Sequence, residues 1–322
     1  MTRRRWRLPL QLHAVGRRDG VIAVAALLFA LALWLPPVTL QRPTYSYLVT
    51  FDLTQSMDVE DAVWNGAPVA RLAAARAAMR ELLPRLPCGS RLGWAIFADY
   101  RTLPLMLPVE VCSHYDELLA SLERIDGRMR WANASNVGKG VTWTVRTARA
   151  IDDATRVVFF TDGHESPPLR ANESPPMGDI VPGEVGGWLI GVGGDAPQRI
   201  PKTTRDGEPA GYWSADEVVQ RGELAPGRSQ EHLSALHEER LKELAKLVGF
   251  GYRRLAGADA LAAAMLDPGF ARPRPTPTDL RWLPALAALA LLAWRFAPPL
   301  PRLRRPTGPG GPPPRSRPSF PR

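Results

Sequence analysis

The chain has 322 residues, of which 45% are hydrophobic and 23% charged, so it can form one large folded domain with further segments around it. Its 41 basic and 32 acidic residues give a net charge of +9, but the excess lies at the ends. Residues 1–18 hold six arginines, residues 295–322 hold seven, and neither segment has an acidic residue. The middle is therefore mildly acidic, which argues against a nucleic-acid-binding domain.

Two apolar segments lie inside these basic ends. Residues 20–36 and 282–298 are each near the short limit for a membrane-spanning helix, about 17–25 residues. Because arginine clusters lie outside both segments, the positive-inside rule predicts a two-pass protein of the bacterial inner membrane, with both termini in the cytoplasm and the middle in the periplasm. No small-x-small pattern follows the first segment, so we expect an uncleaved anchor.

This pattern divides the chain into seven parts. They are a basic cytoplasmic N-terminus (1–19), transmembrane helix 1 (20–36), a linker (37–44), a central domain (45–267), a Pro-rich linker (268–281), transmembrane helix 2 (282–298) and a disordered Pro/Arg-rich tail (299–322). Within the domain, residues 197–237 form a long polar insertion, which is typical of a functional or disordered loop.

Apolar runs and helical spacing alternate through the central domain. The expected strands are 45–52, 91–98, 102–107, 155–161, 185–192 and 252–255. The expected helices are 69–83, 115–125, one that opens from the loop 133–140 and runs to about 151, 238–247 and 258–266. The strands at 91–98 and 102–107 are joined by a tight turn around Tyr100, which indicates an antiparallel pair. The order predicts an α/β fold, a doubly wound and mostly parallel sheet with one antiparallel edge strand.

The first strand ends in a group of oxygen-bearing side chains. Asp52, Thr54 and Ser56 occupy alternate positions directly after the apolar run. Ligands of open α/β sheets bind outside the carboxyl ends of the strands, and hard cations such as Mg²⁺ prefer oxygen ligands. The alternative is that these residues only make an Asx-turn or cap a helix.

Two further segments bring oxygen groups to the same edge. Residues 155–163 form a second apolar strand that ends in Thr161, Asp162 and Gly163. The polar loop 133–140 opens a helix and offers Ser135 as its hydroxyl ligand. A cation site at this edge is therefore the prediction.

The order Asp-x-Thr-x-Ser, Ser-Asn-x-Gly and Thr-Asp-Gly resembles the von Willebrand factor type A (vWA) domain with its metal-ion-dependent adhesion site, over residues 45–267. The resemblance implies that a divalent ion, Mg²⁺ or else Ca²⁺ or Mn²⁺, is held by Asp52, Thr54, Ser56, Ser135 and Asp162. The carboxylates would act mostly through water and the hydroxyls directly. Thr54 stands where Ser is usual in that family and Ser135 where Thr is usual, and both keep the hydroxyl.

The resemblance also implies a function without catalysis, in which a partner protein supplies a carboxylate to the ion. Residues 51–61 and the segments around Cys88 and Cys112 are similar to MxaL-type vWA proteins, which implies help in maturation or metal insertion of a periplasmic enzyme like methanol dehydrogenase. The two-anchor layout is also similar to Bat-type vWA proteins, which accompany MoxR-class AAA+ ATPases. A membrane scaffold of that kind is the alternative.

The two cysteines, Cys88 and Cys112, flank the antiparallel pair about equally far from its turn. Such a hairpin brings the start of one strand beside the end of the other, so we predict a disulfide, as periplasmic proteins permit. Two buried free thiols are the alternative.

Other chemistry is less well supported by the residues. Asp52 in this setting also resembles the nucleophile of haloacid-dehalogenase-like phosphatases, with Lys139 or Lys202 as partner, but those enzymes carry a second Asp where this chain has Thr54. His164 follows the Thr-Asp-Gly motif, and we expect it to be solvated and not a ligand.

Overall fold

The computed structural model describes residues 17–169, 177–204, 206–219 and 230–297. They fall into two compact units: residues 39–277, and the flanking segments up to residue 38 and from residue 278.

A six-stranded sheet forms the centre of the larger unit, in the order β13-β8-β7-β2-β5-β6. The strands are β2 (Ser46–Asp52), β5 (Arg91–Ala98), β6 (Arg101–Glu110), β7 (Arg156–Thr161), β8 (Gly187–Gly191) and β13 (Gly251–Arg254). All neighbours pair in parallel except β5 and β6, which are antiparallel. The doubly wound sheet with one antiparallel edge is as the sequence predicts.

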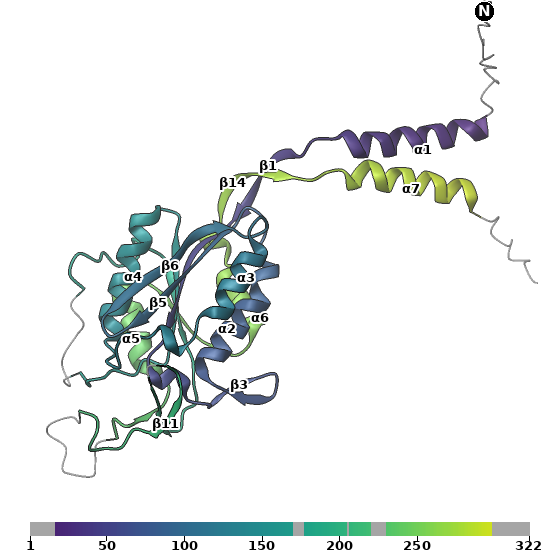
Figure 1. Ribbon diagram of the computed structural model, residues 1–322. Coiled ribbons are helices and arrows are strands. Elements are labelled where there is room, and N and C mark those ends of the chain that lie inside the picture. The colour runs from purple at the N-terminus through teal and green to yellow at the C-terminus, as the bar shows by residue number, and fades with distance from the viewer. Residues whose placement is uncertain (1–16, 170–176, 205, 220–229, 298–322) are drawn as a thin grey trace, which may run out of the picture. The chain divides into compact units, whose positions relative to one another are not determined.

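Helices cover both faces of this sheet (Figure 1). On one face lie α2 (Arg71–Leu82), α3 (Tyr115–Arg124) and α6 (Ala258–Met265), and on the other lie α4 (Val137–Ile151) and α5 (Glu238–Val248). The side chain of Asn136 caps α4 by accepting a 3.0 Å hydrogen bond from the Lys139 amide. Gly249 ends α5 in the left-handed conformation that glycine adopts most readily.

The central strand β2 is buried along its whole length. Its side chains alternate between two hydrophobic cores: Phe51 lies in the core under α2, and Leu48 in the core under α4. The rings of Phe51 and Phe160 stack with centroids 5.4 Å apart, which fixes β2 against β7. Asp52 therefore leaves the sheet from one of its inner strands.

Short elements fill the connections. The strands are β3 (Ala62–Trp64), β4 (Ala67–Val69), β9 (Gln198–Arg199), β10 (Pro201–Thr203), β11 (Pro209–Tyr212) and β12 (Leu233–Ser234), and the 3₁₀ helices are Gln55–Asp58, Leu83–Arg85, Gly127–Met129 and Pro268–Phe270. β9 pairs with β12 and β10 with β11, so the described part of the insertion 197–237 holds two small ribbons that periodicity did not predict.

The predicted linkers also hold strands. β1 (Val38–Thr44) and β14 (Arg272–Thr278) form a two-stranded sheet, and the Thr44 hydroxyl donates to the Arg272 carbonyl at 3.0 Å. Pro273, Pro275 and Pro277 alternate along β14, so the residues between them keep their N–H groups on one side of the strand. This spacing explains how a Pro-rich segment can pair.

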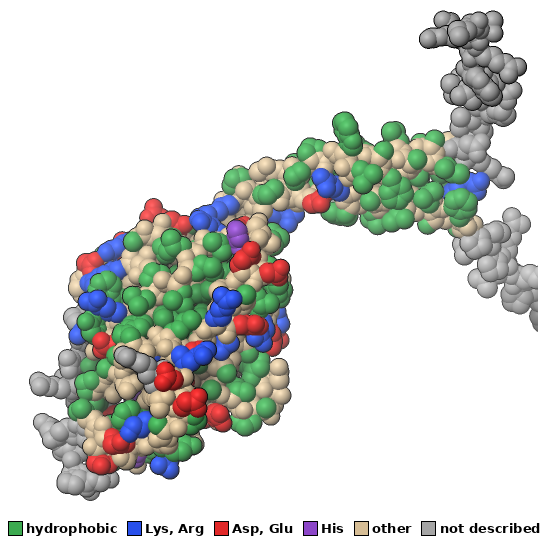
Figure 2. Space-filling view, viewed as in Figure 1, with side chains coloured by type: hydrophobic (Ala, Val, Ile, Leu, Met, Phe, Trp, Pro, Cys, Tyr) green, Lys and Arg blue, Asp and Glu red, His purple; other side chains and the backbone are tan. Residues whose placement is uncertain are grey.

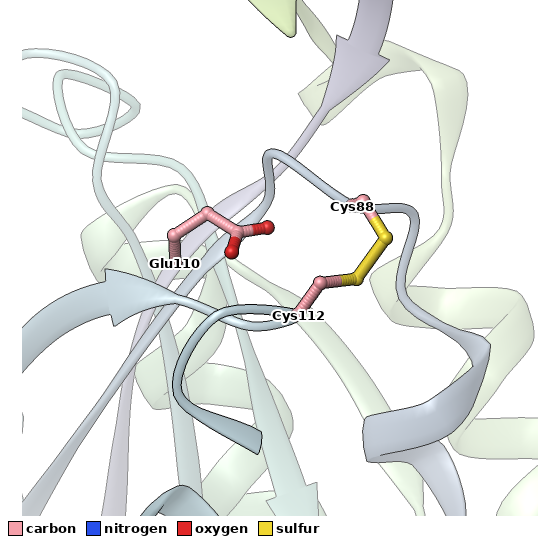
Figure 3. A group of neighbouring side chains, drawn as sticks. All are labelled: Cys88, Glu110 and Cys112. Carbon is pink, nitrogen blue, oxygen red and sulfur yellow. A yellow bond between two sulfur atoms is a disulfide. The ribbon is translucent and has the colours of Figure 1, made fainter. Parts of the chain in front are cut away.

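Cys88 and Cys112 form a disulfide, with their Cα atoms 5.3 Å apart (Figure 3). The antiparallel register pairs Arg91 with Glu110, which brings the two flanking cysteines together as predicted. Beside the disulfide, the Glu110 carboxylate accepts 2.6 Å hydrogen bonds from the amides of Gly89 and Ser113.

The second unit pairs two helices, α1 (Arg17–Trp34) and α7 (Trp282–Phe296). Arg281 donates from Nε to the Leu35 carbonyl at 2.9 Å, and hydrophobic side chains cover much of the visible surface of the pair (Figure 2). Within the described residues, no helix combines the length and the apolar character needed to cross a membrane.

Candidate metal centre

The motif after β2 folds back on itself at the end of the strand. Asp52 accepts two hydrogen bonds on Oδ1, from the Thr54 amide at 2.9 Å and from the Thr54 hydroxyl at 2.7 Å. A 3₁₀ turn then brings the Ser56 hydroxyl to 3.1 Å from that of Thr54. The predicted Asx-turn is therefore present. It brings the side-chain oxygens of Asp52, Thr54 and Ser56 close together.

Asp162 follows β7, the strand next to β2, and its carboxylate is fully buried. Oδ1 accepts the His164 amide at 3.0 Å. Oδ2 accepts the Ser234 hydroxyl at 2.8 Å and the Arg71 guanidinium at 2.5 Å. Both oxygens of Asp162 therefore already have donors from the chain itself.

Ser135 reaches the same edge on the loop before α4. Its amide donates to the Ser166 carbonyl at 2.7 Å, and the next amide, of Asn136, donates to the Asp99 carbonyl at 2.5 Å. The Ser135 side chain is 1% exposed, and its hydroxyl has no hydrogen-bond partner. A buried polar atom without a partner is uncommon and calls for an explanation, such as an ion or a water.

A cavity of about 260 Å³ joins these segments. The hydroxyl-bearing residues Thr54, Ser56 and Ser135 all line it, together with His164. Asp52 and Asp162 do not line it: Asp52 lies behind Thr54 through their hydrogen bond, and Asp162 is turned to Arg71. The structure thus places three of the five predicted residues on one cavity and the two carboxylates behind it.

The pKa values of the two carboxylates are shifted in opposite directions. Burial, with the nearby charge of Asp162 and against the hydrogen bonds from Thr161 and Thr54, raises the pKa of Asp52 to about 7. Burial is also the largest single influence on Asp162 and acts in the same direction, but the Arg71 charge and the hydrogen bonds from the His164 amide and the Ser234 hydroxyl together outweigh it, so the pKa of Asp162 lies below its ordinary value. Asp162 is therefore the firmly ionised member of the pair.

Arg71 is fully buried at the start of α2 and was not among the residues predicted from the sequence. Its Nε and Nη2 bind the Asp61 carboxylate at 2.7 and 2.6 Å, while Nη1 binds Asp162. A signal was present, because Arg71 lies at helical spacing from the apolar positions Ala75, Ala78 and Leu82 and so on the inner face of α2.

His164 differs from the sequence expectation. It is 5% exposed, and burial lowers its pKa to about 4, so the imidazole is neutral. Its ring lies 5.8 Å from the ring of His237, measured between centroids. The chain after β7 turns inward to the cavity, which is why this loop histidine is buried instead of solvated.

The described part of the insertion 197–237 lies beside this edge, as expected from its position after β8. Ile200 and Trp213 line the cavity. The Trp213 indole donates to the Gln55 side-chain carbonyl, and the Gln55 amide donates to the carbonyl and hydroxyl of Thr203, each at 3.2 Å. The motif itself therefore holds the described part of the insertion at the cavity.

The donor set fits a hard divalent cation. The three predicted hydroxyl residues are all buried and line a common cavity in front of a carboxylate, and the Ser135 hydroxyl has no hydrogen-bond partner. Oxygen ligands with some water are what Mg²⁺, Ca²⁺ and Mn²⁺ take. Elsewhere among the described residues, Cys88, Glu110 and Cys112 bring potential ligand atoms together. Their sulfurs form the disulfide, so that group offers no thiolate.

No protein-family model matches the chain, and a search of curated proteins found no match. Similar solved structures include BatB from Bacteroides thetaiotaomicron, with 15% identity, TM-score 0.48, and 70% of this chain and 98% of that chain covered. An aerotolerance-related membrane protein from Bacteroides fragilis NCTC 9343 is 16% identical with a TM-score of 0.47, and the match covers 70% of this chain and 98% of that chain. A von Willebrand factor type A protein from Catenulispora acidiphila is 10% identical with a TM-score of 0.38, and the match covers 78% of this chain and 50% of that chain.

Likeness at these identities concerns the fold alone and says nothing of ligand or partner. These similar structures include a Bat protein and a vWA protein, the two groups that the motifs resemble.

Proposed function

We propose that residues 45–267 form a vWA-type domain that binds a divalent cation and docks a partner protein through it. Thr54, Ser56 and Ser135 would bind the ion directly, and Asp52 and Asp162 would supply negative charge and act through water. One observation carries this proposal: the buried Ser135 hydroxyl has no partner and lines the same cavity as the other two hydroxyls. A cation is the partner that would satisfy it.

Docking follows from coordination chemistry. Mg²⁺ needs six oxygen ligands, and three hydroxyls leave positions for water or for a group from outside. A carboxylate from a second protein matches both the charge of the ion and its preference for oxygen. The ion would thus form the centre of a protein interface, with no chemical step required.

The described residues of the site favour binding over phosphoryl transfer. Asp52 is fully buried, and its two oxygens accept hydrogen bonds from Thr54 and Thr161, so it is not placed as a nucleophile. None of the described residues that line the cavity is a lysine or arginine that would stabilise a phosphoryl group. A binding role accounts for the site better than the phosphatase alternative does.

We also propose that the helix pair holds the domain at the bacterial inner membrane, on its periplasmic side. Several large apolar side chains of α1 and α7 are exposed, among them Leu27, Leu33, Leu286 and Trp294. The Cys88–Cys112 disulfide supports an oxidising compartment. Alkaline extraction of membranes tests this anchoring. We expect the wild type to stay with the membranes and the variant with Leu27→Glu and Leu286→Glu to be released. Release of the wild type by alkali would contradict the proposal.

Two biological settings share this docking step and differ in the partner. One is maturation or metal insertion of a periplasmic enzyme like methanol dehydrogenase, and the other is a Bat-like scaffold beside a MoxR-class AAA+ ATPase system. Co-purification of the full chain with each candidate, with and without chelator, separates the two.

Cation binding is tested first, by titrating the purified full chain with Mn²⁺ and measuring free Mn²⁺ by electron paramagnetic resonance. We expect one bound ion in the wild type, loss of binding in Asp52→Ala, and unchanged binding in Asp153→Ala. Asp153 is a matched control because it is an exposed aspartate at the opposite end of β7. Equal binding by wild type and Asp52→Ala, or no binding at millimolar Mn²⁺, would refute the proposal.

A further inference from the structure

Arg71 makes more side-chain contacts at this edge than ion pairing alone requires. Its guanidinium binds the Asp61 carboxylate through two nitrogens and the Asp162 carboxylate through Nη1. Nη1 also donates to the Ser56 carbonyl at 3.2 Å and the Ser234 hydroxyl at 2.7 Å, and Nη2 to the Ser234 carbonyl at 3.1 Å. One buried group thus joins the motif after β2, the end of β7 and the end of the insertion.

The backbone is shaped to admit this side chain. Gly193 has a φ of +133°, and a Cβ atom there would lie 2.6 Å from Arg71 Nε. Its neighbour Gly194 donates from its amide to Asp61 Oδ2 at 3.0 Å, so the turn after β8 closes over the ion pair. A side chain at position 193 would therefore displace the guanidinium from its hydrogen bonds.

Charge is the consequence that concerns the cation. The single positive charge of Arg71 lies between Asp61, whose side chain is 11% exposed, and Asp162, which is fully buried. A positive group on Asp162 opposes a second cation nearby, and the opposition is strong in a buried site because screening by water is weak. Arg71 and the metal ion thus compete for the charge of the same carboxylate.

We propose that Arg71 is a positioning residue that orients Asp162 and lowers the affinity of the site for its divalent ion. It holds Asp162 Oδ2 away from the cavity in the absence of the ion, and Asp61 moderates its effect by sharing its charge. This inference rests on the proposed cation-binding function and deepens it.

The test compares three variants of the full chain by Mn²⁺ titration. Arg71→Gln keeps a hydrogen-bond donor and removes the charge, and we expect Mn²⁺ to bind at least about tenfold more tightly. Asp61→Asn removes the carboxylate that partly neutralises Arg71, so the charge of Arg71 acts more strongly on the site. We expect the affinity for Mn²⁺ to fall at least about threefold. Arg80→Gln is the matched control, because Arg80 lies on the same helix in a solvent-exposed pair with Glu123, and its affinity should equal that of the wild type.

The direction of change separates a charge effect from damage to the fold. A purely structural role for Arg71 predicts weaker binding in Arg71→Gln, the opposite of our expectation. If Arg71→Gln does not fold, as circular dichroism would show, Asp61→Asn decides: weaker binding supports the proposal and unchanged or tighter binding overturns it. If the wild type binds Mn²⁺ and Arg71→Gln binds it equally or more weakly, this inference alone is overturned. If the wild type does not bind Mn²⁺, both this inference and the proposed function are overturned.

Discussion

The Thr161 hydroxyl donates a 2.6 Å hydrogen bond to Oδ2 of Asp52 and so ties the ends of two neighbouring strands together. The same hydroxyl accepts the Gly163 amide at 3.0 Å, which starts the turn that carries His164 to the cavity. Asp52 is therefore held on one oxygen by its own motif and on the other by β7. The candidate cation site depends on this link between the strands.

Thr161→Val should destabilise the domain, because the near-isosteric change leaves a buried carboxylate oxygen and an amide without their partner. We expect a loss of about 2 kcal/mol in the free energy of unfolding, measured with urea in the presence of chelator. Thr147→Val is the control, since that hydroxyl bonds only the Trp143 carbonyl on the helix surface, and it should change stability by less than about 0.5 kcal/mol. Equal effects of the two changes would show that the link is unimportant.

Ser135→Ala should separate ion binding from folding. Because the Ser135 hydroxyl has no hydrogen-bond partner, its removal should leave the unfolding free energy in chelator within about 0.5 kcal/mol of the wild type. The affinity for Mn²⁺ should fall at least about tenfold, through loss of a ligand.

Ser121→Ala provides the contrast. Its hydroxyl lies on α3, outside the cavity lining, and accepts the Trp94 indole at 3.0 Å, so stability should fall by about 1 kcal/mol and Mn²⁺ affinity should not change. An unchanged affinity in Ser135→Ala would remove Ser135 from the site.

The disulfide should contribute to stability by restricting the unfolded chain. Cys88 and Cys112 are separated by 24 positions, for which loop entropy predicts about 3 kcal/mol. The variant carrying both Cys88→Ser and Cys112→Ser should lose about that much free energy of unfolding, measured with urea. Reductant should lower the free energy of unfolding of the wild type but not that of this variant. A variant as stable as the oxidised wild type would disprove the contribution.

Trp213→Phe should loosen the insertion without changing the core. The change removes the indole donor to Gln55, and a hydrogen bond of about 1 kcal/mol corresponds to a roughly fivefold rise in the open population. Limited proteolysis should therefore cut within residues 197–237 about fivefold faster, with urea unfolding unchanged. Trp131→Phe is the control, because the Trp131 side chain is 40% exposed on the loop before α4. Protease should cut this variant at the wild-type rate. Identical rates for both variants would mean that Gln55 does not hold the insertion.

Much of the fold could be predicted from the pattern of apolar and polar residues in the sequence. β2 and β7 are buried on both faces, so they read as unbroken apolar runs, and the polar residues that end them mark the carboxyl edge of the sheet. The disulfide was predictable for a similar local reason, because a short hairpin fixes which residues meet at its open end.

Long-range pairing was beyond the reach of local patterns. β1 and β14 come from opposite ends of the larger unit, and three prolines in β14 favoured a linker when read alone. The ribbons of the insertion are two to four residues long, too short to show any period.

The sequence by itself determined the alternation of strands and helices and the oxygen groups at the strand ends, because both follow from the polarity of neighbouring residues. Only the tertiary structure decided that Asp162 faces Arg71, that Ser135 lacks a partner and that His164 is buried. Those properties depend on which distant segments meet in space, and a buried arginine differs from a surface one only through the carboxylates that the fold brings to it.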